Sequence, residues 1–443
     1  MNSLINDFNI FHSYRNQIRE NKRSFFNISY NSDIALLNGH PNLDNHGEFY
    51  LSQSLTHLTG FRFTFNNSWL LLEIEPYKLN MISLNNNNLN DKGYNWEESI
   101  FTFDPVYKSY EYLNNHSLNN NSEIEFKQSQ ILVHYNGIGF SYGNTNHWWS
   151  PGFHSALSLS SNAPSQKTYA IGTFKDIFIG RFGISAQMIA MPYKSINDNQ
   201  LYFSGLKAHV SHHSKSAIIS LGFHRTYLSG NFGNLSSSTV STDSWSLIDA
   251  ARLVVEPLFG QDKKDLSYTQ PGTPGFDAWD ELLTGFVKIS FPQFGLVVYA
   301  DVASDDNRGN LTDLKAHWDH TLGYQLGFTK QTKVNQYNVF TGVEFLTTRI
   351  SNTFNPKFYR GGEPANYYAK PIYDYFTYQG RRMGAHSGSS SDDLIFMLGL
   401  SNDVSSTLMS YNKERHGVKR MTHPEIKTEY VLTYHRKITT RQT

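Results

Sequence analysis

The feature that most constrains this chain is an alternation of apolar and polar residues with a period of two. In one example, Phe61, Phe63 and Phe65 are separated by Arg62 and Thr64. Successive side chains of a β-strand point to opposite faces of the sheet, so each such stretch predicts a strand with one apolar and one polar face. The sequence therefore predicts an all-β fold. The clearest stretches are residues 28–34, 61–65, 219–223, 287–291, 322–328 and 426–434.

Composition supports strands and excludes several classes of protein. Charged residues are 17% of the 443 residues, against about a quarter in an ordinary globular protein. Aromatic residues reach 15%, and they pack well on pleated sheets. The net charge of zero gives no electrostatic reason to expect a nucleic acid partner. The absence of cysteine excludes disulfides, thiolate metal sites and cysteine nucleophiles.

Two architectures would carry such strands: a soluble sandwich or solenoid, and a transmembrane antiparallel β-barrel. We favour the barrel because the strands recur along a chain that is long for one sandwich, and because Gly, Ser and Thr fill the polar faces. No apolar run approaches the roughly 18 residues of a membrane helix. Aromatic residues at expected strand ends resemble the interfacial girdle of a barrel. These are Tyr77, Tyr142, Phe203 and Tyr227.

The connections are of two kinds, as in bacterial barrels with short periplasmic turns and long outer loops. Asn66-Asn67 predicts a tight turn between two strands. Long segments rich in Asn, Ser, Gly and aromatic residues predict ordered surface loops. They cover residues 84–125, 230–246, 259–279 and 351–393.

No composition break divides the chain, so we expect residues 1–443 to form one barrel domain. Residues 1–20 lack the apolar region of a signal peptide, which an exported barrel needs. Residues 437–443 are basic and polar and do not end on an aromatic residue. We therefore expect the barrel to be incomplete at both ends, with a signal peptide and a final strand outside this sequence.

One region is more specific than the rest. Residues 137–143 read GIGFSYG, 146–152 read NHWWSPG, and 155–164 read SALSLSSNAP. This resembles the signature of the capsule assembly Wzi family, in which two tryptophans precede a Gly-Pro-Gly-like turn and an alternating Ser/Leu strand. Ser150 departs from the glycine that is usual there, although Pro151 and Gly152 still supply turn residues. The motif residues with an expected structural role are Pro151, Gly152, Ser155, Leu157, Asn162, Ala163 and Pro164.

The resemblance implies a barrel of about 18 strands whose long outer loops plug the lumen. It also implies a non-enzymatic, lectin-like protein of the outer membrane that binds capsular or other surface polysaccharide and helps attach the capsule. Lipid and lipopolysaccharide would surround it, and we expect a monomer. It implies neither a cofactor nor a metal.

Aromatic rings suit the apolar faces of sugars, and Asn, Arg and His suit their hydroxyls. The candidate polysaccharide-binding residues are His147, Trp148, Trp149, Tyr367, Tyr368, Tyr373, Tyr375, Arg381, Arg382 and His386. Structural alternatives stay open for each group. The tryptophans would equally hold loops to the barrel wall, the tyrosines would pack in loops or a girdle, and the arginines would pair with lumen carboxylates or lipid headgroups.

Other chemistry in the sequence is weaker. Residues 139–143 match the G-x-S-x-G nucleophile motif, but they lie in an expected strand with no helix after it. No histidine has a metal-ligand spacing. Asp301, Asp305, Asp306 and Asp313 predict an acidic loop without the spacing of a calcium site. Two rival functions remain: a diffusion or transport channel with an open lumen, and a carbohydrate-active enzyme.

Overall fold

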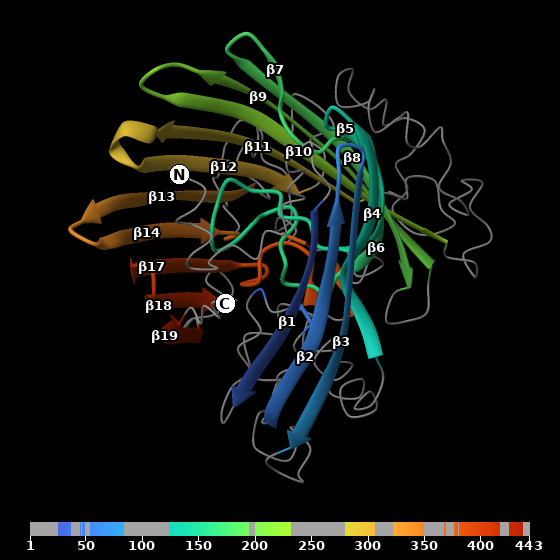
Figure 1. The fold of residues 1–443 in the computed structure, drawn as a ribbon, viewed down its shortest axis with the longest axis horizontal. Helices are drawn as coiled ribbons and strands as arrows, with labels where there is room; N and C mark the ends of the chain where they lie inside the picture. Colours follow the sequence, from blue (N-terminus) through green and yellow to red (C-terminus); the bar gives the residue numbers. More distant parts are fainter. Residues whose placement is uncertain are drawn as a thin grey trace, which may run out of the picture.

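The computed structural model is an all-β molecule built around one large antiparallel sheet of 17 strands (Figure 1). It describes residues 25–36, 45, 47–48, 54–83, 124–194, 200–231, 280–305, 322–349, 367–368, 376–379, 381–416 and 425–436. Among these, no helix is long and apolar enough to cross a membrane. The fold class predicted from the alternation is confirmed.

The first half of the sheet comprises β1 (Phe25–Leu36), β2 (Ser54–Asn66), β3 (Leu70–Ser83), β4 (Ile124–Tyr135), β5 (Ile138–Thr145), β6 (Gln166–Thr173), β7 (Ile177–Ile179), β8 (Phe182–Lys194) and β9 (Gln200–His213). The second half comprises β10 (Ile218–Asn231), β11 (Asp280–Phe291), β12 (Leu296–Asp305), β13 (Leu322–Val334), β14 (Tyr337–Thr347), β17 (Ser391–Ser401), β18 (Ser405–His416) and β19 (Glu425–Arg436). A separate hairpin pairs β15 (Thr377–Tyr378) with β16 (Arg381–Arg382).

The strands form a meander in which each pairs with its neighbours in the sequence. β6 and β7 pair with successive parts of β8, so they share one position in the wall. Each of β1 and β19 has one ladder among the described residues, to β2 and to β18. The sheet curls around a central space that other parts of the chain enter (Figure 1).

The connections alternate strictly between the two ends of the sheet. Seven short connections, such as residues 67–69 and 136–137, lie at one end, which we call the turn end. The remaining connections lie at the opposite loop end, and most of them are longer. At the turn end, Asn136 and Gly137 both have positive φ (51° and 90°), as a two-residue hairpin requires. The Asn67 carboxamide accepts the N–H groups of Trp69 and Leu70, so the tight turn predicted at Asn66-Asn67 is confirmed.

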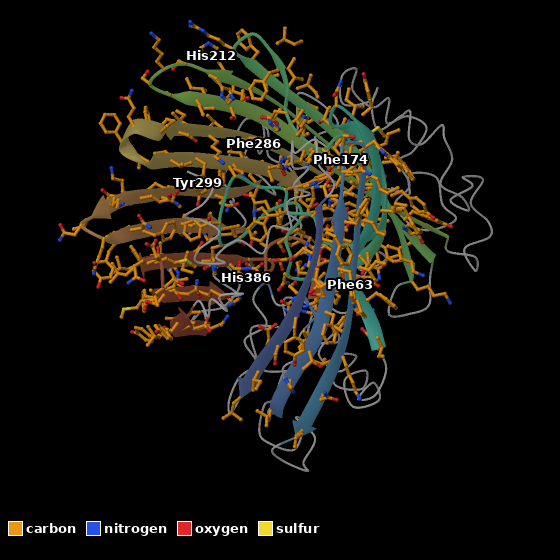
Figure 2. The ribbon with its side chains drawn as sticks, in the orientation of Figure 1. Phe63, Phe174, His212, Phe286, Tyr299 and His386 are labelled. Carbon is orange, nitrogen blue, oxygen red and sulfur yellow. The ribbon has the colours of Figure 1, made fainter. Side chains whose placement is uncertain are left out.

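The sheet has its apolar face outside and its polar face inside, the reverse of a soluble protein. Leu326 in the middle of β13 is 56% exposed, whereas its neighbour Gln325 is 1% exposed. Apolar side chains are exposed in this way along most strands, and the buried wall residues include Glu75, Arg225, Asp301 and Glu344 (Figure 2). Such a continuous apolar surface is far larger than soluble monomers expose, and it fits contact with lipid.

An aromatic band exists, but not with the residues predicted for it. Tyr77, Phe203 and Tyr227 point inward and are at most 6% exposed, so their assignment to a lipid-facing girdle is wrong. Tyr142 is exposed, within β5. Alternation decides which face a strand residue lies on, and aromatic identity does not. The exposed aromatics that gather at the turn end are Phe26, Trp69, Tyr135, Phe178, Phe182, Phe294, Tyr337 and Tyr434.

Two predicted loops also differ from the structure. Asp301 and Asp305 belong to β12 and point inward. Both lie on the inward face of this strand, so this part of the predicted acidic loop is a strand. Asp306 and Asp313 lie outside the described residues. The loop predicted over residues 351–393 contains the β15–β16 hairpin, and β17 begins at Ser391.

The outward face of β13 provides a test of lipid contact. We expect Leu326→Arg to lower the stability of the barrel in lipid vesicles by about 2–4 kcal/mol, because an arginine at mid-bilayer depth is poorly solvated. Val334 lies on the same face at the turn end, so Val334→Arg should cost about 0–1 kcal/mol. Urea unfolding in vesicles measures both. Equal small effects would contradict the membrane-facing assignment.

Candidate functional site: the lumen plug

A segment without regular structure enters the space inside the sheet. Residues 146–165, which we call the inner segment, leave β5 at the loop end and return to β6 at the same end. Phe153 packs edge-on against Phe340 at 6.3 Å between ring centroids, and Phe340 lies three residues from the start of β14 at the turn end. The inner segment therefore descends deep into the lumen and comes back out.

A buried carboxylate holds the deepest part of the inner segment. Glu344 on β14 accepts the backbone N–H groups of Phe153 and Ser155, both at 2.7 Å, and the His154 N–H at 3.2 Å. Gln325 and Tyr299 donate to the same carboxylate. Successive N–H groups turned toward one anion form a strong charge-assisted site, which orders the backbone around it.

The residues just before this contact explain two features of the motif. A Cβ added to Gly152 would lie 2.0 Å from the Gln325 Nε2 and 2.9 Å from a Glu344 oxygen, so a larger residue would displace both side chains from their present contacts. Ser150, the departure from the family pattern, uses its hydroxyl to donate to Asp301 at 2.9 Å and to accept the Gly152 N–H. The serine therefore gives the turn an attachment to β12 that glycine cannot make.

Trp149 anchors the inner segment to a different part of the wall. Its ring is 1% exposed, lies 5.6 Å from the His224 ring, and has the Lys207 ammonium 5.9 Å from its centroid. A Cβ on Gly205 would approach the indole to 2.6 Å, so the wall is recessed where the ring docks. Trp148 is half-buried and donates its indole N–H to the Gly152 carbonyl. Trp149 therefore has the structural role that was the alternative to sugar binding, because it holds the inner segment to the barrel wall.

A second piece of chain packs against the inner segment. Residues 376–390, which we call the late segment and which include β15 and β16, meet it through Ser160, whose N–H donates to the Met383 carbonyl at 2.8 Å. The Asn162 carboxamide donates to the Arg382 carbonyl at 3.0 Å. Tyr368, just before the late segment, donates its hydroxyl to the Leu157 carbonyl at 2.7 Å and accepts the Ala385 N–H. The two segments form one unit, which we call the plug.

The plug has an apolar core at the loop end of the lumen. Leu157, Leu159, Tyr367, Phe376 and Met383 are all buried there. They pack on wall residues near the loop ends of their strands, namely Ile189, Met191, Tyr193, Leu201, Phe203, Leu228, Leu282, Ala303 and Leu346. Phe203, one of the inward aromatics that do not form a girdle, therefore helps to hold the plug.

Most of the predicted sugar-binding residues are inside this plug. Tyr367, Tyr368, Arg381 and Arg382 are at most 3% exposed. The Arg382 guanidinium lies 4.7 Å from the Tyr368 ring centroid, and Arg381 donates to Asn162. His386 lies beside His154 and Asp393. Tyr373 and Tyr375 lie outside the described residues. In this conformation the buried members offer no surface to an external polysaccharide.

The strand expected over residues 155–164 is not formed. Ser155, Leu157, Asn162, Ala163 and Pro164 are all buried, yet their backbone makes no ladder with the sheet. The alternation of Ser and Leu instead separates small polar contacts from apolar ones. Ser158 bonds to Thr284 at 2.5 Å, and Ser160 donates to the Gly384 carbonyl at 2.6 Å.

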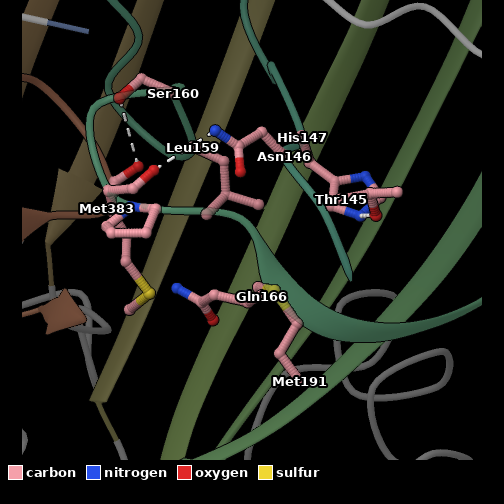
Figure 3. Close-up of a pocket in the computed structure, with 10 residues that line it drawn as sticks. Thr145, Asn146, His147, Leu159, Ser160, Gln166, Met191 and Met383 are labelled. Carbon is pink, nitrogen blue, oxygen red and sulfur yellow. Dashed lines mark hydrogen bonds between the residues drawn. The ribbon is translucent and has the colours of Figure 1, made fainter. Parts of the chain in front are cut away.

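A cleft lies at the loop end, beside the inner segment (Figure 3). Its cavity volume is about 20 Å³, far below the roughly 300 Å³ at which small-ligand pockets begin. His147 lies on its wall, and burial, with a smaller effect from Lys207, lowers the pKa of that imidazole to about 3. His147 is therefore neutral at physiological pH. The lining is Thr145, Asn146, His147, Leu159, Ser160, Ala163, Pro164, Gln166, Met191 and Met383.

A solved structure has a similar fold. Wzi, an outer membrane protein involved in group 1 capsule assembly in Escherichia coli and described as a carbohydrate-binding β-barrel, superposes on 93% of this chain and 76% of its own, with a TM-score of 0.56. The fold is that of the Wzi barrel. The resemblance found in the sequence is thus confirmed for the fold, and at 12% identity the match shows the fold alone. The chain has the architecture of an outer-membrane β-barrel.

Other comparisons are weaker. OmpF of Salmonella typhi, in complex with daunomycin, has a TM-score of 0.42 at 8% identity over 93% of this chain and 96% of its own. OmpT of Vibrio cholerae has a TM-score of 0.36 at 10% identity, with the same coverage. Both superpose too loosely to inform the site. No protein-family model and no curated protein matches the sequence.

The Glu344 contact predicts how the plug is held. We expect Glu344→Gln to lower the free energy of unfolding by about 2–3 kcal/mol and to expose residues 146–165 to protease, because an amide turns a donor toward the backbone N–H groups. Glu73→Gln is the control, since Glu73 is a wall carboxylate with an 11% exposed side chain that pairs with Arg62 and Gln130 of the wall. Urea unfolding and limited proteolysis test this. Similar behaviour of the two variants would contradict the anchoring role.

The two adjacent tryptophans should differ sharply. We expect Trp149→Ala to cost about 3–5 kcal/mol, as for other large aromatic residues deleted from a core. Trp148→Ala should cost clearly less, because that ring is only half-buried. Thermal unfolding, followed by the mobility shift of folded barrels in unheated gels, measures both without using tryptophan fluorescence. An equal loss in the two variants would show that Trp149 is not the anchor.

Proposed function

We propose that this protein lies in the bacterial outer membrane with its loop end outside, binds capsular or other surface polysaccharide, and helps attach it to the cell. The observation that carries the proposal is the plug. Glu344, Trp149 and the late segment fix chain inside the lumen, where a diffusion channel needs open space. A rigid, filled barrel is suited to present a binding surface.

Two further observations support it. The strict separation of short turns from longer loops matches the periplasmic and outer ends of bacterial barrels. The fold is shared with a protein described as a carbohydrate-binding barrel of capsule assembly. We place lipid and lipopolysaccharide against the apolar outer face and propose a monomer.

We propose that a sugar unit contacts the loop-end cleft, through neutral His147 and the accessible part of Trp148. The neutral imidazole both donates and accepts hydrogen bonds, as sugar hydroxyls require. The cleft is too small to enclose a sugar unit, so one unit of a chain that runs over the surface would contact its mouth.

We propose binding without cleavage. Ser141 of the G-x-S-x-G motif lies within β5 and is buried, and the inner segment that follows β5 contains no helix. A nucleophile elbow needs a strand–turn–helix that exposes the serine.

The test is binding of the detergent-purified barrel to the surface polysaccharide of its own host. We expect saturable binding with no new reducing ends, weakened about tenfold, or 1.4 kcal/mol, by His147→Ala and by Trp148→Ala. Trp69→Ala is the matched control, since Trp69 lies at the turn end. It should bind as the wild type does.

The same preparation distinguishes the rival functions. In planar bilayers the wild type should give no steady conductance steps of an open pore. Large steps together with no polysaccharide binding would replace the proposal with a channel. Release of sugar fragments would replace it with an enzyme, and binding unchanged in both loop-end variants would move the contact to another part of the loop end.

A further inference from the structure

Three side chains from separate parts of the chain meet in the lumen near the loop end. His154 comes from the inner segment, His386 from the late segment, and Asp393 from β17 of the wall (Figure 2 labels His386). Each offers one ligand atom, and these atoms lie within 4.8 Å of one another. We propose that they form a binding site for a divalent first-row transition metal ion such as Zn²⁺.

The distances between the Asp393 carboxylate and the two imidazoles suit ligands that surround one ion better than partners in a hydrogen-bonded network. The Asp393 Oδ2 lies 3.0 Å from the His386 Nε2 and 3.2 Å from the His154 Nε2. That oxygen is buried and nevertheless accepts no well-aligned hydrogen bond. Ligands of a tetrahedral zinc ion at about 2.0 Å stand about 3.3 Å apart and point at the ion instead of one another.

A fourth residue completes the surroundings. Asn412 on β18 is 2% exposed, and its carboxamide N–H groups donate to the Asp393 Oδ1 at 2.6 Å and toward the His154 Nε2 at 3.1 Å. The donation to Oδ1 holds the carboxylate and leaves Oδ2 for the ion, as outer partners of metal ligands do. The Asn412 Oδ1 is buried without a hydrogen-bond partner, so a small turn of the amide would supply an oxygen ligand.

The local charge favours a cation. Glu344 binds the His154 N–H, and Glu414 stands opposite Asp393 across the β17–β18 ladder. Three carboxylates thus surround the two imidazoles, and Lys427 is ion-paired to Glu414 at 2.7 Å. Two imidazoles and one carboxylate are the donor set of zinc, iron, nickel and copper sites, whereas calcium and magnesium prefer oxygen alone.

An ion at this position would link three separate parts of the chain. Without it, the inner segment, the late segment and the wall are held together by hydrogen bonds and apolar packing. An ion bound by one ligand from each would join all three directly. The His154 side chain is 11% exposed, so the ion has a route of entry. The site goes beyond polysaccharide binding and stands or falls separately from it.

The experiment uses the folded, chelator-treated wild-type barrel in detergent, titrated with Co²⁺ and then Zn²⁺. We expect one equivalent of Co²⁺ to give the visible absorption of a four-coordinate ion, Zn²⁺ to displace it, and Zn²⁺ to raise the thermal midpoint reversibly with EDTA. Asp393→Asn and His386→Gln should bind at least tenfold more weakly.

His209→Gln is the matched control. His209 also lies 3.1 Å from a carboxylate, that of Asp176, but far from this cluster along the wall on β9. It should bind Co²⁺ as the wild type does. A wild-type barrel that binds no stoichiometric ion, or ligand variants that bind as tightly as the wild type, would overturn the site.

A measurement on the wild type alone covers the case in which the ligand variants fail to fold. Carbethoxylation of histidines, read by mass spectrometry, should be slowed by Zn²⁺ at His154, whose side chain is 11% exposed, and unchanged at His209. Equal labelling of His154 with and without Zn²⁺ would also overturn the proposal.

Discussion

The interior of this barrel depends on a single buried carboxylate. Glu344 is surrounded by donors from the inner segment and from neighbouring strands. The carboxylate is buried. Removing its donors would therefore leave a buried charge without a partner, and removing the charge would leave buried N–H groups without an acceptor. This mutual dependence fixes where Phe153 and Ser155 lie, and Trp149 and the late segment add their own contacts to the same plug.

The sequence predicts the wall well, because one physical rule governs it. A strand that separates lipid from a polar interior must alternate, and the exposed Leu326 beside the buried Gln325 shows that rule in its simplest form. Turn chemistry is equally local, as Asn136-Gly137 and Asn67 demonstrate. The same rule also explains the errors: Tyr77 and Phe203 were assigned by residue type, while their strand register places them inside.

The sequence shows that a special segment exists at the position of the plug, but it does not show which residues of the wall that segment contacts. The motif around Trp148-Trp149 marks it, but its partners lie up to about two hundred residues away in the sequence. Nothing near Glu344 distinguishes it from any other polar residue on a lumen face, and the same is true of Asp393. His154 and His386 have no metal-ligand spacing, because the ligands come from three segments that only the folded wall brings together. Sequence alone cannot show such convergence without a family alignment or a structure.

The route of the inner segment has a consequence for assembly. Residues 146–165 come early in the chain, yet groups that receive them are on β9 to β14, β17 and β18, all of which come later. The segment therefore cannot reach its final place until the wall has been built almost to its last strand. During that interval its tryptophans and leucines lack their partners, so the order of events is set: the wall first, its filling last. Closing contacts of such long range is slow, and a cell making this protein must protect the half-built barrel until the last strands arrive.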